Sequence, residues 1–226
     1  MGVDPASSLA GVRFGAMTVA AAFALTLSLA LDWWAVHRQR VPLERVAKPL
    51  VMVALGWLAL SIGAIHSDVG RLVLVALVLS LAGDVFLLGS SSADFLGGLV
   101  SFLLAHGAYI FAFLALGFQR WPALAGLLIA GSLGLTSGRR IVRAAAREGG
   151  GALGAGVMAY LVVISVMVVT ASGTARLLVL LGALSFLISD TVLATDRFVG
   201  PRAHARMVVI VTYHLGQVLM VIGALR

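Results

Sequence analysis

The 226-residue chain is 61% hydrophobic and only 11% charged, and its mean hydropathy is +1.09. Since a soluble domain is about half apolar and about a quarter charged, these values exclude a soluble globular protein. The net charge of +7 comes without the basic stripe and interleaved aromatic residues of nucleic-acid-binding proteins, so we expect no nucleic-acid partner. The lack of cysteine excludes disulfides and thiolate chemistry.

Apolar runs follow one another along the chain, and each is close to the ~20 residues that cross a ~30 Å hydrocarbon core. They cover residues 14–35, 48–65, 71–89, 96–117, 121–136, 152–171, 176–195 and 206–225. The first run follows Arg13 and is longer than the apolar part of a signal peptide, so we interpret it as a membrane helix. The runs are continuous and do not alternate with period two, which favours helices over strands. The sequence predicts one integral membrane domain over residues 1–226, an all-α polytopic membrane protein of about eight transmembrane helices.

Arginine and lysine residues are distributed unevenly between the two faces of such a bundle. The loops after the first, third, fifth and seventh runs hold Arg38, Arg40, Arg45, Lys48, Arg139, Arg140, Arg143, Arg147, Arg197, Arg202 and Arg206. The opposite face holds Arg13, Arg71, Arg120, Arg176 and Arg226. Because basic loops stay in the cytoplasm, both termini are predicted to be non-cytoplasmic. The Ala-, Gly- and Arg-rich composition is typical of a bacterial protein, so we expect a multi-pass protein of the inner cell membrane.

A short internal repeat links the third and seventh runs. Residues 81–87 read LAGDVFL and residues 187–193 read LISDTVL, and a histidine, His106 or His214, follows on the next run in each case. This pattern indicates two four-helix halves in the same orientation, as in transporters with parallel repeats. A chance match between short apolar motifs is the alternative.

Glycine residues inside the runs let helix backbones approach closely. We interpret the following glycines as packing positions: Gly97, Gly98, Gly126, Gly131, Gly134, Gly154, Gly156 and Gly182. Such faces would allow a homodimer, but they serve packing within one chain equally well.

Two acidic residues, Asp84 and Asp190, are flanked by apolar residues on both sides within the third and seventh runs. A carboxylate at membrane depth costs about 3 kcal/mol even on the most lenient scale. A hydrogen bond between helices is the structural alternative, but two carboxylates at matched depth favour a functional site. Asp32 lies beside Trp33 and Trp34 and is interpreted as a solvated helix end in an interfacial aromatic belt.

Several other polar side chains reach the depth of the two aspartates. With a rise of about 1.5 Å per residue, Lys48, His106, Tyr160 and Tyr213 lie in the same cytoplasmic half of the bilayer as the aspartates. The candidate substrate-binding residues are therefore Lys48, His106, Tyr109, Tyr160, Ser189, Tyr213, His214 and Gln217. A hydrogen bond or a packing contact within the protein is the alternative for each of them.

Paired carboxyl groups in a low-dielectric site do not ionise equally, so one stays protonated while the other carries the charge. Acid-catalysed hydrolysis of acetals and vinyl ethers uses that combination. Proton-coupled transporters also keep intramembrane carboxylates, so a small transporter or a lipid-binding protein is the alternative. The chain contains no G-x-S-x-G elbow of a serine lipase and no H-x₃-H spacing, so we expect no metal and no cofactor.

Taken in order, several motifs resemble the YhhN family of membrane proteins. They are Ala47–Leu50, Gly83–Asp84, Phe102 through His106 to Tyr109, Ala159–Tyr160, Ser185–Phe186, Ser189–Asp190, and Tyr213 with Gln217. The resemblance covers about residues 13–225. Animal members of the family hydrolyse the vinyl ether bond of lysoplasmalogens to a fatty aldehyde and a glycerophospho-ethanolamine or -choline.

The resemblance implies a lysophospholipid substrate taken from the bilayer, with Asp84 and Asp190 as the catalytic pair. Lys48 and loop arginines would then bind the phosphate. Tyr160, Tyr213 and His106 would orient water or the oxygen substituents of the lipid.

Overall fold

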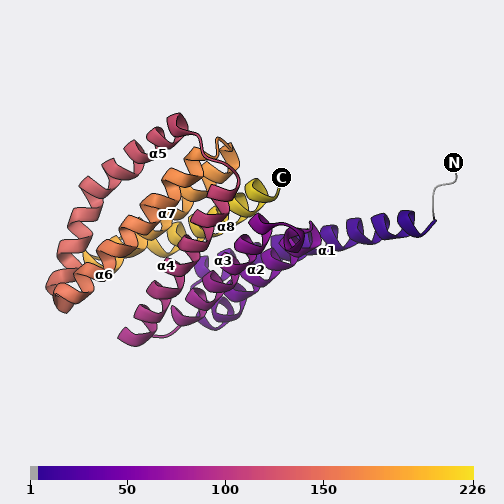
Figure 1. Ribbon diagram of the computed structural model, residues 1–226. Coiled ribbons are helices and arrows are strands. Elements are labelled where there is room, and N and C mark those ends of the chain that lie inside the picture. The colour runs from indigo at the N-terminus through magenta and orange to yellow at the C-terminus, as the bar shows by residue number, and fades with distance from the viewer. Residues whose placement is uncertain (1–4) are drawn as a thin grey trace.

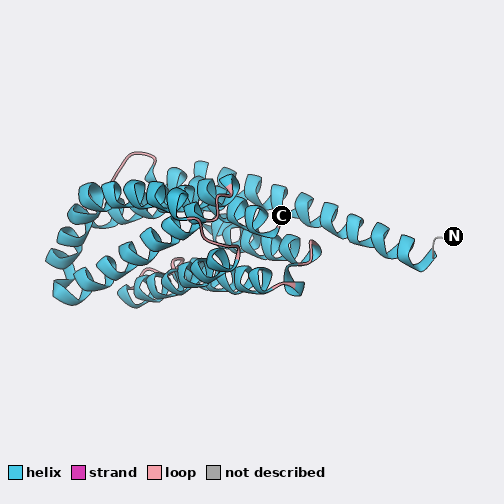
Figure 2. Ribbon diagram, turned by 45° about the horizontal axis from the view of Figure 1, so that its top comes forward, coloured by secondary structure: helices cyan, strands magenta, loops and turns pink. Residues whose placement is uncertain are grey.

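The computed structural model describes residues 5–226, with side chains from residue 15 onward. Every regular element in this part of the chain is a helix (Figure 2), which confirms the predicted all-α class. The long helices are α1 (Pro5–His37), α2 (Val41–Ser61), α3 (Asp68–Phe86), α4 (Ser92–Ala115), α5 (Arg120–Leu133), α6 (Arg139–Gly173), α7 (Leu177–Phe198) and α8 (Ala205–Leu225). Two short elements accompany them, η1 (Ala64–His66) before α3 and η2 (Gly134–Gly138) between α5 and α6.

Several helices are long and apolar enough to cross a membrane, so the chain is a multi-pass membrane protein. Within the described residues there are 6 such segments, namely Gly15–His37, Asp68–Phe86, Ser92–Ala115, Arg120–Gly173, Leu177–Phe198 and Ala205–Leu225. The predicted count of about eight spans is therefore not confirmed. One reason is α2, which begins at Val41 rather than at residue 48 and carries Glu44, Arg45 and Lys48 near its start.

The other reason is the segment Arg120–Gly173, which counts once although it has 54 residues. A straight helix of that length would be about 80 Å long, far more than a ~30 Å core. A turn at Gly149 and Gly150 divides it, and Gly150 has a φ of 74°, a conformation that glycine adopts readily. The chain reverses there, so α5 and the second part of α6 form the hairpin at the edge of the bundle in Figure 1. Residues 139–148, predicted as a loop, are helical.

Polar contacts between helix ends show how the helices alternate in direction. Arg206 at the start of α8 pairs with Glu44 near the start of α2, and Arg197 near the end of α7 pairs with Glu148 at the α6 turn. At the opposite end, Arg176 donates to backbone carbonyls at the end of α8. The basic residues predicted for one face thus gather at one end of the bundle. The side chain of Arg13 lies outside the described residues.

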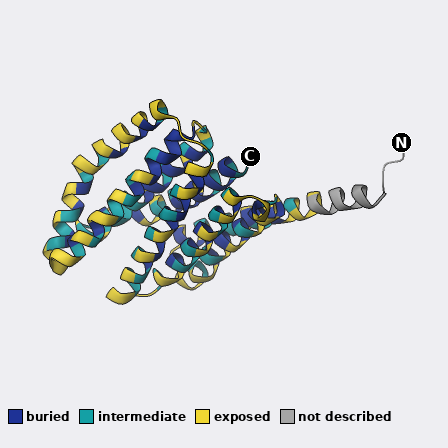
Figure 3. Ribbon diagram, viewed as in Figure 1, coloured by how far each residue is buried: buried dark blue, intermediate teal, exposed yellow. Residues whose placement is uncertain are grey.

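The buried side chains face the centre of the bundle, whereas α5 exposes most of its surface (Figure 3). Glycines permit close approach between helices: a Cβ at Gly182 of α7 would lie 2.7 Å from the backbone nitrogen of Met220 of α8. A Cβ would also clash with a neighbour at Gly97, Gly98, Gly126 and Gly154. The packing role predicted for Gly131, Gly134 and Gly156 is wrong, because these three glycines have open space on the side where a Cβ would lie.

Candidate active site

Asp84 on α3 is fully buried and held from two sides. The Nζ atom of Lys48 on α2 lies 2.9 Å from its Oδ1 atom and forms an ion pair. The hydroxyl of Tyr213 on α8 donates to Oδ2 at 2.7 Å, and the Lys48 ammonium also lies 5.7 Å from the Tyr213 ring centroid. Because a cation and a hydroxyl donor both contact it, Asp84 is stabilised as a carboxylate in a fixed orientation.

Asp190 on α7 has different partners and a different exposure. The hydroxyl of Tyr160 on α6 donates to its Oδ2 atom, and Nε2 of His106 on α4 lies 3.9 Å from the same oxygen. The side chain of Asp190 is 13% exposed, whereas that of Asp84 is 0% exposed. Asp190 is therefore the aspartate that a molecule entering from outside can reach.

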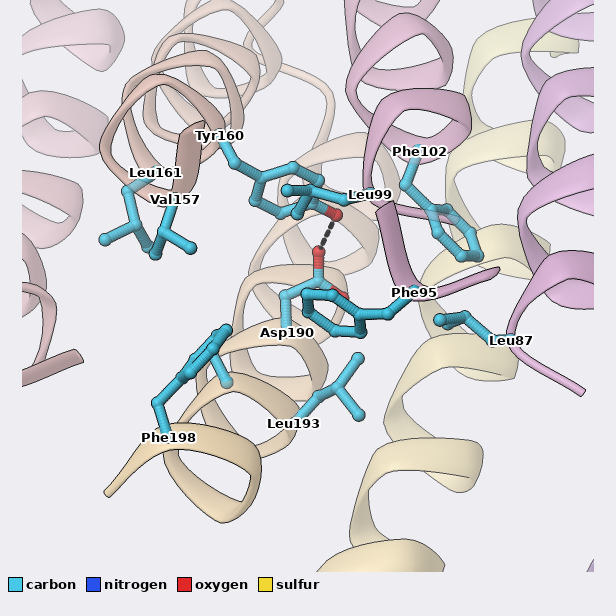
Figure 4. Close-up of a pocket in the computed structure, with 11 residues that line it drawn as sticks. Leu87, Phe95, Leu99, Phe102, Val157, Tyr160, Leu161, Asp190, Leu193 and Phe198 are labelled. Carbon is cyan, nitrogen blue, oxygen red and sulfur yellow. Dashed lines mark hydrogen bonds between the residues drawn. The ribbon is translucent and has the colours of Figure 1, made fainter. Parts of the chain in front are cut away.

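Asp190 reaches a narrow pocket between α4, α6 and α7, with a volume of about 50 Å³. Tyr160 and Asp190 are its polar lining residues, and their hydrogen bond lies in the middle of Figure 4. The remaining lining is aliphatic and aromatic, and Phe95, Phe102 and Phe198 contribute rings to it. The arrangement presents one carboxyl group to an apolar slot.

Two aromatic rings separate the Asp84 cluster from the Asp190 cluster. The Phe186 ring centroid lies 5.3 Å from that of Tyr213 and 4.7 Å from that of His106. Phe102 contacts Tyr213 edge-on at 5.7 Å. The residues predicted for one pocket thus form two clusters on either side of an aromatic wall. The clusters are still close enough for the charges of Asp84 and Lys48 to act on Asp190.

Asp32 was interpreted wrongly from the sequence, because it is fully buried rather than solvated. α1 continues to His37, and His214 of α8 lies beside Asp32. The apolar residues Ala35 and Val36, which follow the tryptophans, are the sequence signal that the helix continues past Asp32. The Oδ2 atom of Asp32 lies 3.9 Å from Nδ1 of His214. That nitrogen accepts a hydrogen bond of 3.1 Å from the indole N–H of Trp33.

Neither carboxylate oxygen of Asp32 has a hydrogen-bond partner among the residues that the structure describes. Asp32 is close enough to Glu44, Lys48 and Asp84 for their charges to act on it. Lys48 is thus a cation shared by more than one carboxylate. A buried carboxylate without donors destabilises a fold, and such groups in membrane helices mark functional sites. Asp32 is thus a further candidate site residue, which the sequence analysis assigned to solvent.

Replacement of Asp32 by asparagine is expected to raise the free energy of unfolding by about 1–3 kcal/mol, because it removes a buried charge without hydrogen-bond donors. Thermal unfolding of the purified protein in detergent measures the effect. Asp68→Asn is the matched control: its carboxylate is exposed and pairs with Arg71, and loss of an exposed ion pair should change the free energy of unfolding by less than about 1 kcal/mol. A lower melting temperature for the Asp32 variant would contradict this expectation and would show that the carboxylate stabilises the fold.

The remaining predicted site residues are bonded within the protein. Tyr109 donates to Oε1 of Gln217 at 2.5 Å, and the amide of Gln217 donates to Oγ of Ser80 at 2.9 Å. Ser189 donates to the backbone carbonyl of Val209 at 3.0 Å. These bonds connect α3, α4, α7 and α8, and a role in substrate binding stays a prediction. From residue 15 to the end, the His, Asp and Glu side chains form no group of three that could hold a metal ion.

Most of the chain, including both aspartate clusters, is similar to known proteins. The model of the YhhN family matches residues 43–224, a range that includes both clusters but not Asp32. Lysoplasmalogenase TMEM86B of Homo sapiens is 34% identical over 154 residues, which is 67% of this chain and 62% of that protein. This chain thus spans less than two thirds of that relative's length. No solved structure matches the chain. With about four fifths of its length matched by the family model, the chain belongs to the YhhN family.

Proposed function

We propose that the protein is a membrane hydrolase that cleaves the vinyl ether bond of lysoplasmalogen-type lysophospholipids. The products are a fatty aldehyde and a glycerophospho-alcohol. One observation carries the proposal: a carboxyl group, Asp190, lies on a narrow apolar slot, with a second, ion-paired carboxylate behind the slot's aromatic wall. The relationship to a human protein named a lysoplasmalogenase supports the same reaction.

Asp190 is the proposed acid. It reaches the slot, and no lysine or arginine among the described residues pairs with it. No ion pair therefore stabilises its carboxylate form over its protonated form. Its proton goes to the β-carbon of the vinyl ether, where the π electrons form the new C–H bond. The positive charge then lies on the α-carbon and the ether oxygen as an oxocarbenium ion.

The Asp190 carboxylate left by this step stabilises the cation and then accepts a proton from the water that adds to the α-carbon. The hemiacetal collapses to the aldehyde as its C–O bond breaks, and the hydroxyl proton passes to the departing glycerol oxygen. Tyr160 donates to Asp190 and holds it in place through both steps. Asp84 and Lys48 supply fixed charges behind the aromatic wall.

The lining of the slot supports a lipid substrate. Apart from Tyr160 and Asp190 its side chains are aliphatic or aromatic, so the slot favours a hydrocarbon group over a polar ligand. A lysophospholipid carries one chain, and its vinyl ether lies at the head-group end of that chain. The reactive bond would then lie beside Asp190 and Tyr160, which stand in the middle of the slot among apolar side chains.

For the topology, we propose eight crossings, with α2 and the two arms of the 120–173 segment each crossing once. The helix ends alternate between the two ends of the bundle, and the basic residues gather at one of them. By the positive-inside rule this end is cytoplasmic in the cell membrane, so both termini lie outside. The slot then lies in the cytoplasmic leaflet.

A small proton-coupled transporter is the second candidate. Asp84 of α3 is contacted by Tyr213 of α8, and Asp190 of α7 lies near His106 of α4. Each aspartate thus meets a side chain from the other predicted half, as in transporters with internal repeats. The repeat itself stays a prediction.

Release of fatty aldehyde from a vinyl-ether lysophosphatidylethanolamine by the purified protein in detergent tests the hydrolase. We expect aldehyde and glycerophosphoethanolamine in equal amounts, and no product from the saturated alkyl-ether analogue, which lacks the π electrons that accept the proton. Heat-unfolded protein is the control for spontaneous acid hydrolysis. If folded protein releases no aldehyde from either the ethanolamine or the choline lipid, the hydrolase is rejected and the transporter is favoured.

A further inference from the structure

A second hollow, with a volume of about 570 Å³, lies beside the end of α7. Its basic lining residues are Arg140, Arg143 and Arg147, and Phe198 and Glu148 border them. We call this hollow the arginine cleft. The three arginines are three and four residues apart in the helix, so their side chains lie on one face. The cleft exists because residues 139–148 are helical and lie against the end of α7.

The positive charge of the arginine cleft is not neutralised within the described part of the chain. Its acidic residue, Glu148, is bound by both terminal nitrogens of Arg197, at 3.0 and 2.6 Å. Arg140, Arg143 and Arg147 are exposed and have no ion pair or hydrogen bond to any described side chain. Three guanidinium groups therefore converge on a hollow with no anion of the protein to pair with.

The arginine cleft adjoins the apolar slot. Phe198 lines both, and its ring meets Phe95, another slot residue, edge-on at 5.7 Å. The guanidinium of Arg197 lies over both rings, 5.1 and 5.5 Å from their centroids. Along α7, Asp190 and Phe198 are separated by about 12 Å. A molecule with an apolar chain and an anionic group can thus contact both hollows.

We propose that the arginine cleft binds the phosphate of the lysophospholipid while the ether bond lies beside Asp190 in the slot. The proposal rests on the proposed function, because it deepens the substrate assignment for the same site. Guanidinium groups bind phosphate oxygens through paired hydrogen bonds, and three of them face this hollow. The task expected for Lys48 thus belongs to these arginines, since Lys48 is paired with Asp84.

Binding of ligands that cannot be hydrolysed separates this proposal from the proposed function. The probes are a saturated 1-alkyl lysophosphatidylethanolamine, the 1-alkylglycerol that lacks its phosphate, and inorganic phosphate, each titrated into protein in a maltoside detergent. The test variant is Arg143→Gln/Arg147→Gln. The control variant is Arg38→Gln/Arg139→Gln, which removes the same charge from the same end of the bundle but leaves the cleft intact.

We expect the cleft variant to weaken binding of the phosphate-bearing lipid by about tenfold or more, as loss of charge-assisted hydrogen bonds does. The cleft variant should bind the alkylglycerol with unchanged affinity. The control variant should bind both the phosphate-bearing lipid and the alkylglycerol with unchanged affinity. Equal losses in the two variants, or an equal loss for the alkylglycerol, would overturn the proposal. Arginine-dependent binding of inorganic phosphate with no such dependence for the lipid would overturn it in favour of a free-phosphate site. None of these readouts needs turnover, so a failed hydrolase assay leaves the binding result intact.

Discussion

Replacement of Asp190 by asparagine is expected to lower the rate of fatty aldehyde release by about 10²–10⁴-fold, because the amide has no proton to donate to the β-carbon. The fold should persist, since asparagine keeps the size of the side chain and an oxygen that can accept from Tyr160. The measurement is aldehyde release by purified variants, with size-exclusion profile and melting temperature as the check on folding.

Asp68→Asn, on an exposed side chain at the start of α3, is the matched control and should keep native activity. The carboxylate at position 190 can also be restored in longer form with Asp190→Glu, which should recover part of the lost rate. Native activity in a well-folded Asp190→Asn variant would contradict the assignment of Asp190 as the acid and would leave the reaction without its proton donor.

Replacement of Lys48 by methionine is expected to destabilise the fold by about 3–5 kcal/mol, because it leaves the charge of Asp84 buried and unpaired. Methionine keeps much of the apolar stem, so the loss reports mainly on the charge. The double variant Lys48→Met/Asp84→Asn should recover most of this stability, since both charges are then gone. Thermal unfolding of the single and double variants in detergent measures the coupling between the two residues.

The rate of aldehyde release by the double variant is a second measurement. If the two fixed charges act on the reaction at Asp190, the double variant should be stable but slow. A Lys48→Met protein as stable as the native one would show that Asp84 does not depend on this ion pair. A stable and fully active double variant would show that the charges of Asp84 and Lys48 do not act on the reaction.

The two aspartates have different surroundings, and these determine the role proposed for each of them. Asp84 is held between an ammonium and a hydroxyl, whereas Asp190 has a hydroxyl and a neighbouring histidine and reaches the slot. Two like groups with different partners divide the roles of fixed charge and proton donor. Because the dipoles and charges are set by packed helices, they need little reorganisation when charge develops on the substrate.

The all-α class and the presence of carboxylates inside membrane helices followed from the sequence alone. Continuous apolar runs of membrane-spanning length permit no other backbone structure in lipid, since each peptide group must be hydrogen-bonded within its own segment. The cost of a carboxylate in that medium also singled out Asp84 and Asp190 before any contact was known. These inferences depend only on local composition and on the length of each run.

The tertiary structure decided which polar residues meet. Helices that are apolar all round have no polar face from which their rotation could be predicted, and their contacts are set by close packing of small residues, as where Gly182 of α7 meets α8. For that reason the sequence predicted one pocket where Phe102 and Phe186 separate two clusters, and it left Asp32 in solvent although α8 covers it. The arginine cleft likewise depends on tertiary structure. Residues 139–148 were predicted as a loop, but they form a helix that ends at the turn of Gly149 and Gly150 and presents its arginines on one face.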